Sequence, residues 1–545
     1  MYIVEDFIDT GISHTITPNT LSSSSLRLAE NWLARCSVYH ESCNATRTQD
    51  DYHPTRLLDL GISGEGSVIR LIETKESACN GSYAALSHCW GGSLPIALKE
   101  ENIHALKKSI RLEELPKTFQ HGVYLARYLN NRYLWIDSLC IIQDSEDDWE
   151  REAICMKDVY RNANVTVAAT GAAKSSVGCF FDRDVDLIKT VTVSISWQGA
   201  RQGIYEVCDG NIWQENIVNA PLIQRAWVVQ ERLLSPRILH FGREQIAWEC
   251  QWSNACETFP DQLPPTLWLF GDDYFKSLLE ESSDDLIALH WEEIASTYSQ
   301  GRLTNESDKC IALSGIVDAI QSHTTDEYLA GLWKSQFIRH LCWSIMALDN
   351  RERPRLPRRS LHYRAPSWSW LSMESSIQYF GSVCALEDDN SKSMMDIIHV
   401  DIQNTGQSKL GPIQSGQILA RGYLRKARWD RVPGDQGMML ALDDLRIPQG
   451  EFWNFMPSQV IMDAGAYDPL QDVVCLPLLE HKTPEHRFQD GEYVGLILAA
   501  TGEEVDKYRR VGCFQLSWKS SESLMKEDRG DGIRIEVPRR LVTIV

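Results

Sequence analysis

Apolar blocks alternate with helix-like blocks through the first half of the chain. Residues 82–88 ("SYAALSH"), 132–137 ("RYLWID") and 163–171 ("ANVTVAATG") are apolar enough for buried strands. Between them, residues 115–131 carry apolar side chains at helical spacing. Residues 144–162 begin with a polar cap and three acids, which favour the positive end of a helix. Strands separated by helices in this order predict a parallel sheet with covering helices.

The segments on either side extend this pattern. A serine run before "LRLAENWLARC" predicts a helix with one of the serines as its N-cap. Residues 221–234 ("PLIQRAWVVQERLL") predict a helix that opens on Pro221, and residues 237–251 predict a hairpin. The glycines of 61–67 ("GISGEGS") match no phosphate-binding loop and predict a turn.

Beyond about residue 260 the pattern changes twice, first to helical and then to short strands. The sequence therefore predicts an N-terminal helical or extended segment at 1–65, an α/β domain at 66–258, a helical region at 259–355 and a β-rich domain at 356–545. Trp368 and Trp370 alternate in "APSWSWLS", which predicts a strand that packs between domains.

Composition narrows the classes of partner and compartment. The chain of 545 residues has a net charge of −21, which argues against a nucleic-acid surface. It contains no run of 18 apolar residues, so no membrane span is predicted. The first residues have neither the basic start nor the apolar core of a secretion signal. Fifteen cysteines without that signal predict reduced thiols and a cytoplasmic protein.

Polar and reactive side chains follow three of the predicted strands. In a parallel α/β sheet, ligands bind beyond the carboxyl ends of the strands, so these residues predict one wall of a small-molecule pocket. The alternative is that loops are polar anyway and that a residue such as Asp137 only caps a turn. The residues at the strand ends are Ser87, His88, Cys89 and Trp90, then Asp137, Ser138 and Cys140, then Thr170 and Gly171.

The helix at 221–234 adds a carboxylate and an indole. Trp227 and Glu231 are four residues apart and share a helix face. A carboxylate shielded by the ring could have a raised pKa and take part in acid–base chemistry. Arg225 and Gln230 are further ligand-binding candidates. The alternative is a surface helix in which Trp227 is core and Glu231 pairs with an arginine.

Two cysteine arrangements raise further hypotheses. Cys36, His40 and Cys43 have the spacing C-x3-H-x2-C, which suits a metal, but zinc wants four ligands and no second pair is close in sequence. A packed thiol and imidazole cluster is the favoured interpretation there, with no cofactor required. Cys89 beside His88 suggests a nucleophile and base, although adjacent strand residues point to opposite faces. Cys140 could approach Cys89 across the strand tips.

Three long blocks resemble the signature blocks of the heterokaryon-incompatibility (HET) domain of filamentous fungi. They are "YAALSHCWGG", the stretch from "LPKTFQHGVYLARYLNN" to "ANVTVAATGA", and "RAWVVQERLLSPRILHFGREQIAWEC". The resemblance runs from about Arg70 to Cys250. "YSQGRLTNESDKCIALSGI", "GLWKSQFIRHLCWS" and "APSWSWLS" resemble segments that follow the domain in such proteins.

The resemblance implies a function and a mechanism. HET domains trigger cell death when different hyphae fuse, and they are similar to TIR domains, which have a flavodoxin-like sheet. Some TIR domains hydrolyse NAD with the glutamate of a W-C-x-x-E pattern. Here Trp227 and Glu231 match, and Val228 replaces the cysteine. NAD is then a candidate substrate, with Glu231 holding the ribose, Trp90 or Trp227 stacking, and Ser87, His88, Asp137 and Arg225 orienting ribose or phosphate.

Two other functions stay open. The same pocket could belong to a tailoring enzyme of secondary metabolism that uses His88, Cys89, Asp137 and Cys140 on a non-nucleotide substrate. Alternatively, the domain could be a signalling adaptor that self-associates without turnover. A small-molecule or nucleotide substrate and a homo-oligomer are the partners expected.

Overall fold

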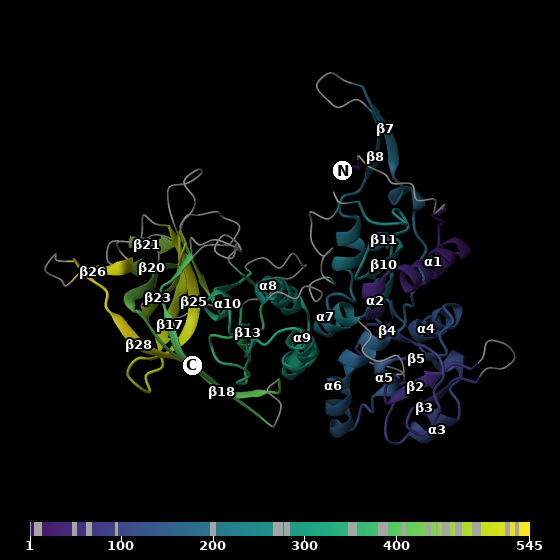
Figure 1. The fold of residues 1–545 in the computed structure, drawn as a ribbon, viewed down its shortest axis with the longest axis horizontal. Helices are drawn as coiled ribbons and strands as arrows, with labels where there is room; N and C mark the ends of the chain where they lie inside the picture. The colour runs from purple at the N-terminus through teal and green to yellow at the C-terminus, as the bar shows by residue number, and fades with distance from the viewer. Residues whose placement is uncertain are drawn as a thin grey trace. The chain divides into compact units, whose positions relative to one another are not determined.

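The computed structural model describes residues 2–4, 14–45, 52–61, 68–92, 96–196, 203–264, 267, 276, 284–346, 357–379, 391–405, 410–431, 438–442, 445–448, 458–463, 471–481, 492–517, 524–528 and 534–545. The chain forms two compact units, residues 1–280 and 281–545 (Figure 1). Each unit is described by itself.

A mixed sheet of eight strands is the centre of the first unit. Its four inner strands β9, β6, β4 and β5 are parallel, as the alternating pattern predicts, and antiparallel strands extend both edges. The spatial order is β11 (Asn254–Cys256), β10 (Ile246–Cys250), β9 (Arg237–Phe241), β6 (Val165–Ala168), β4 (Tyr83–Ser87), β5 (Tyr133–Trp135), β2 (Arg56–Asp59) and β3 (Arg70–Glu73).

The order of the parallel strands defines a topological switch point. Numbered along the chain, the four strands lie in the order 2-1-3-4, which is how the flavodoxin-like order 2-1-3-4-5 begins. The chain leaves β4 toward one neighbour, β5, and later returns to its other neighbour, β6. Ser87, the last residue of β4, is paired with Ala168 at the end of β6. Ligands of such sheets bind beyond the carboxyl ends of the strands at this point.

Helices cover the sheet and confirm most of the predicted segments. They are α1 (Ser23–Tyr39), α2 (Glu41–Ala45), α3 (Ile103–Lys108), α4 (Lys117–Tyr128), α5 (Asp137–Cys140), α6 (Glu146–Asn162) and α7 (Ala226–Leu234). Ser22 caps α1 by accepting a hydrogen bond from the Ser25 amide at 3.1 Å. The acids predicted for the first turn of α6 include Asp148, which forms a buried ion pair with Arg56 at 2.7 Å.

The prediction that a helix opens on Pro221 is wrong. α7 begins at Ala226 because residues 221–224 form a turn and Arg225 is extended. The Leu222 amide donates to the Thr170 carbonyl at 3.3 Å, which holds this turn on the end of β6. The predicted hairpin at 237–251 is confirmed as β9 and β10. A small sheet of β1 (Tyr2–Val4), β8 (Gly203–Cys208) and β7 (Val191–Ile195) completes the unit. The glycine-rich 61–67 segment lies outside the described residues except for Gly61.

The second unit combines helices with a large, mostly antiparallel sheet. Its helices are α8 (Asp284–Gln300), α9 (Ile311–Gln321) and α10 (Phe337–His340). The sheet contains β16 (Ser391–Ser393), β17 (Asp396–Asn404), β18 (Ile413–Tyr423), β19 (Arg425–Arg431), β20 (Met438–Leu442), β21 (Leu445–Pro448), β22 (Ser458–Met462), β23 (Gln471–His481), β24 (Glu492–Ala500), β25 (Lys507–Ser517) and β28 (Arg539–Ile544). Shorter pairs join β12 (Tyr328–Leu329) to β13 (Leu332–Trp333), β14 (Trp343–Ile345) to β15 (Ile377–Tyr379) and β26 (Lys526–Asp528) to β27 (Arg534–Glu536).

The predicted strand at "APSWSWLS" is also wrong in form. Residues Trp370–Ser372 make a turn of 3-10 helix, and both tryptophans are fully buried. The Trp370 indole donates to the Gly331 carbonyl at 2.8 Å, and the Trp343 indole donates to the Trp368 carbonyl at 2.9 Å. These bonds tie the segment to the turn between β12 and β13 and to β14. None of the helices in the described ranges combines the length with the apolar character that a membrane crossing requires.

Candidate functional site

The carboxylate of Glu231 meets the end of β4 inside the first unit. The Ser87 hydroxyl donates a hydrogen bond to Glu231 Oε2. Glu231 is only 4% exposed and most of α7 is buried, so the alternative of a surface helix does not hold. Ser87 faces α7, and Cys89 belongs to the same apolar cluster as Val228 of that helix. His88 points to the opposite face and lies edge-on to Phe119 of α4, with the two ring centroids 4.8 Å apart. Consecutive strand residues alternate between faces, so α4 and α7 cover opposite faces.

Burial dominates the electrostatics of this carboxylate. It raises the pKa of Glu231 above its ordinary value, against the charge of Arg225 and the hydrogen bond from Ser87. Tyr160 of α6 is a further neighbour, and burial together with the charges of Glu231 and Asp137 raises the pKa of its phenol well above the usual range. The carboxylate therefore has donors around it but little water.

His88 is buried beside Asp137, and among the described residues neither of its ring nitrogens has a hydrogen-bond partner of ordinary geometry. Nδ1 lies 3.7 Å from Asp137 Oδ1, which is too long for a hydrogen bond, and no described residue bonds to Nε2. Burial lowers the pKa of His88, more than Asp137 raises it, which favours the neutral ring. An unpartnered imidazole in the interior is costly unless something else satisfies it.

The side chain of Asp137 is partly exposed to solvent. Its side chain is 19% exposed, and it accepts hydrogen bonds from the Trp90 indole at 2.8 Å and from the Ser138 amide at 2.6 Å. Arg225, at the N-cap of α7, donates to the carbonyl of His88. We call Ser87, His88, Trp90, Asp137, Tyr160, Arg225 and Glu231 the strand-end cluster.

Other predicted residues lie in packed surroundings. Cys89 and Cys140 belong to different apolar clusters. Burial raises the pKa of Cys89 to about 11 and that of Cys140 to about 12, so both are protonated thiols at neutral pH. Trp227 is half-buried and lies edge-on to Trp149, with the two ring centroids 6.5 Å apart. Ser138 and Gln230 are fully buried, and within the described residues their side-chain polar atoms have no hydrogen-bond partner.

A second buried group lies on the other side of α7 and escaped the sequence analysis. Arg232 donates to both oxygens of Glu249, with distances of 2.7–3.0 Å. His240 Nε2 lies 3.1 Å from Glu249 Oε2, and its Nδ1 lies 2.9 Å from the Thr170 hydroxyl. Burial alone would raise the pKa of Glu249, but the charge of Arg232 and these hydrogen bonds hold it well below its ordinary range. We call these residues the salt-bridge network.

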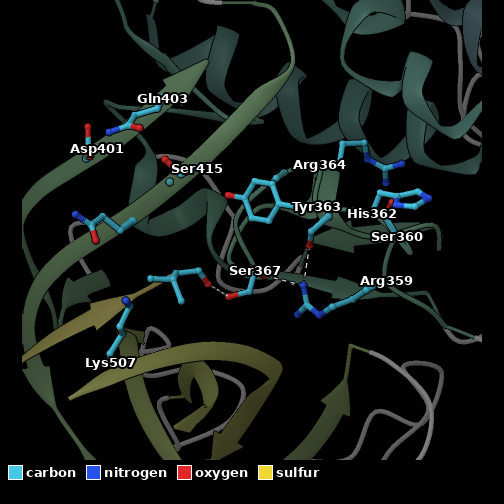
Figure 2. Close-up of a pocket in the computed structure, with 15 residues that line it drawn as sticks. Arg359, Ser360, His362, Tyr363, Arg364, Ser367, Asp401, Gln403, Ser415 and Lys507 are labelled. Atoms are coloured by element: carbon cyan, nitrogen blue, oxygen red, sulfur yellow. Dashed lines mark hydrogen bonds between the residues drawn. The ribbon is translucent and has the colours of Figure 1, made fainter. Parts of the chain in front are cut away.

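A cavity in the second unit contains none of the predicted residues. It measures about 670 Å³ and is lined by Arg359, Tyr363, Ser367 and Lys507 among others (Figure 2). Its basic groups already have partners. Arg359 binds Asp463 at 3.0 Å and the Ser372 hydroxyl at 2.8 Å, and Lys507 pairs with Glu503 and Glu504. This cavity therefore offers little unpaired charge to a ligand.

The structure supplies a fourth ligand for the metal site predicted at Cys36, His40 and Cys43. Cys250, at the end of β10, lies with Cys36, His40 and Cys43, and the four ligand atoms are all within 4.8 Å of one another. The spacing along the sequence could not show this ligand, because Cys250 lies 210 residues beyond His40.

The first unit is thus an α/β domain with a partly parallel sheet. The buried carboxylate of Glu231 at the switch point of this sheet marks a candidate ligand site. Residues 83–231, from the first residue of β4 to Glu231 itself, match the family model of the heterokaryon incompatibility protein (HET), so this part of the chain is a HET domain. A search of curated proteins and a search of solved structures each found no match.

Proposed function

We propose that the HET domain is a hydrolase that cleaves the N-glycosidic bond of a nicotinamide nucleotide such as NAD. In this proposal the protein is a cytoplasmic effector of cell death in heterokaryon incompatibility. The observation that carries it is the burial of Glu231 against the Ser87 hydroxyl at the switch point of the sheet. The 2-1-3-4 strand order supports the comparison with TIR domains.

The chemistry follows from where charge develops. The bond between ribose C1′ and the nicotinamide nitrogen breaks, and the electron pair leaves with nicotinamide, which becomes neutral. An ionised Glu231 would stabilise the resulting oxocarbenium-like ribose and hold its hydroxyls. Water then adds to C1′ and releases one proton, so the products are nicotinamide and ADP-ribose.

The neighbours of Glu231 suit the rest of such a substrate. Arg225 brings a positive charge near Glu231 and is suited to a phosphate. His88 lies on the opposite side of the strand end, so its ring nitrogens would bond a part of the substrate that extends past the end of β4, one as donor and one as acceptor. Trp90, fixed by Asp137, supplies a ring at the exposed edge on which a base can stack.

Nicotinamide release by the purified full-length chain tests the proposal. We expect release by the wild type at concentrations where the chain self-associates, and its loss in Glu231→Gln. Glu150→Gln is the matched control, since Glu150 is exposed on α6, and it should release nicotinamide like the wild type. Assembly without any release, as an adaptor would show, or equal release by Glu231→Gln, would contradict the proposal.

A further inference from the structure

Three cysteines and a histidine converge in the first unit, away from the strand-end cluster. Cys36 lies in the last turn of α1, His40 follows that helix, Cys43 lies in α2, and Cys250 is the last residue of β10. Their ligand atoms lie within 4.8 Å of one another, and all three thiols are free and buried. Two stretches of chain, far apart in sequence, thus supply one set of soft ligands.

Local structure explains how three of these ligands share one corner. α1 ends because His40 is extended, and its amide donates to the Cys36 carbonyl at 3.1 Å. α2 starts at the next residue, Glu41, which brings Cys43 back toward the end of α1. On the other side, Cys250 begins a turn in which its amide donates to Ser253 at 3.1 Å. Cys250 Sγ then lies 3.5 Å from His40 Nδ1.

The surroundings of Arg237 indicate that the cluster carries negative charge. Arg237 is 1% exposed, and its Nε donates to Cys36 Sγ at 3.2 Å. Its other partners are the Asn44 side-chain oxygen and the Asn164 carbonyl at 3.5 Å. Within the described residues, no carboxylate pairs with this guanidinium. A buried cation needs a counter-charge, and neutral thiols cannot provide it.

We propose that Cys36, His40, Cys43 and Cys250 bind one Zn²⁺ ion in a closed tetrahedral site. Three thiolates, a neutral imidazole and Zn²⁺ carry a net charge of −1, which Arg237 balances. Sulfurs on one zinc lie roughly 3.8 Å apart, since each Zn–S bond is about 2.3 Å. The observed cluster needs only a small contraction to reach that geometry.

The ligand set also assigns the role of the ion. Four protein ligands leave no open position for water or substrate, so the site is structural and not catalytic. It would fasten the α1–α2 corner to β10, next to the outer strand of the central sheet. This inference is independent of the proposed hydrolase activity, and either can fail without the other.

Metal content of the full-length chain is the first test. The chain is purified with zinc in the growth medium and washed with a weak chelator, and its metals are measured by mass spectrometry. We expect about one zinc per chain in the wild type and its loss in Cys43→Ser. Cys155→Ser is the matched control, because Cys155 is a half-buried thiol on α6 outside the cluster, and it should keep its zinc. A metal-free wild type, or full zinc content in Cys43→Ser, would overturn the proposal.

A second test does not depend on a variant that loses a ligand. His40→Cys keeps four ligands, so we expect it to retain about one zinc per chain. Loaded with Co²⁺, the wild type should show the visible bands of a tetrahedral Cys₃His site, and His40→Cys the shifted bands of a Cys₄ site. Stripping the wild type with a strong chelator should lower its melting temperature, and added zinc should restore it. Identical Co²⁺ spectra in the two proteins would overturn the assignment of His40.

Discussion

Two adjacent residues of α7, Glu231 and Arg232, enter buried surroundings of opposite kinds. Arg232 joins a network in which both oxygens of Glu249 and both ring nitrogens of His240 have partners. Glu231 contacts the Ser87 hydroxyl at the end of β4, and burial raises the pKa of its carboxyl. At the same strand end, the ring nitrogens of His88 have no hydrogen-bond partner of ordinary geometry among the described residues. Fully satisfied buried charges hold a fold together, whereas unsatisfied ones are costly and are retained where a ligand completes them. Under the proposed function, Arg232 and Glu249 stabilise the domain, whereas Glu231 takes part in the chemistry.

Breaking the salt-bridge network should give the largest effect. Glu249→Gln leaves the Arg232 guanidinium buried without its counter-charge, so we expect the free energy of unfolding to fall by about 3–5 kcal/mol. Urea unfolding of the full-length chain, followed by tryptophan fluorescence, measures this loss. The double variant Arg232→Met/Glu249→Leu removes both charges and should recover much of it. If Glu249→Gln unfolds like the wild type, the network does not hold the domain together.

The matching change in the strand-end cluster should affect activity and spare the fold. Glu231→Gln removes a buried charge but keeps its shape, so the free energy of unfolding should stay within about 1 kcal/mol of wild type or rise. The loss of charge stabilisation should lower kcat/KM for nicotinamide release by about 10²–10³-fold. A destabilisation as large as that of Glu249→Gln would instead give Glu231 a structural role.

Activity and stability should depend differently on pH, because burial raises the pKa of Glu231 whereas the partners of Glu249 lower its pKa. Catalysis needs ionised Glu231, whose pKa is raised by burial, so activity should fall with falling pH already above the ordinary glutamate range. Glu249 has a lowered pKa in the folded chain. Its contribution to stability is thus present above the unfolded pKa of about 4.3 and is lost only as pH falls below that value. Activity and melting temperature measured across one pH series should show activity falling first, by about tenfold per pH unit.

The smallest expected effect is at the exposed edge of the strand-end cluster. Trp90→Phe keeps an aromatic ring and removes the hydrogen bond to Asp137. We expect a cost of about 1 kcal/mol in substrate binding, which is a roughly fivefold rise in KM with little change in kcat. Steady-state nicotinamide release measures both constants. A large fall in kcat with an unchanged KM would show that Trp90 does more than position the substrate.

Much of the strand-end cluster was predictable because the strands are short apolar runs whose ends can be read directly. Ser87, His88, Asp137 and Glu231 follow from that rule together with the family resemblance. Tyr160 was missed because it lies among the buried residues of α6, where an aromatic side chain looks like core. Cys250 and Glu249 were missed for a different reason. Each partners a residue on another element, and only the folding of β10 into the sheet brings them there.

Nicotinamide release per folded molecule, compared between Glu231→Gln and Glu249→Gln, tests the central claim most directly. Release is measured beside the folded fraction under the same conditions. The account predicts that Glu231→Gln is folded and inactive, while the activity of Glu249→Gln falls only in proportion to its folded fraction. If both variants lose activity strictly in proportion to unfolding, the two sides of α7 do not differ in function and the account is contradicted.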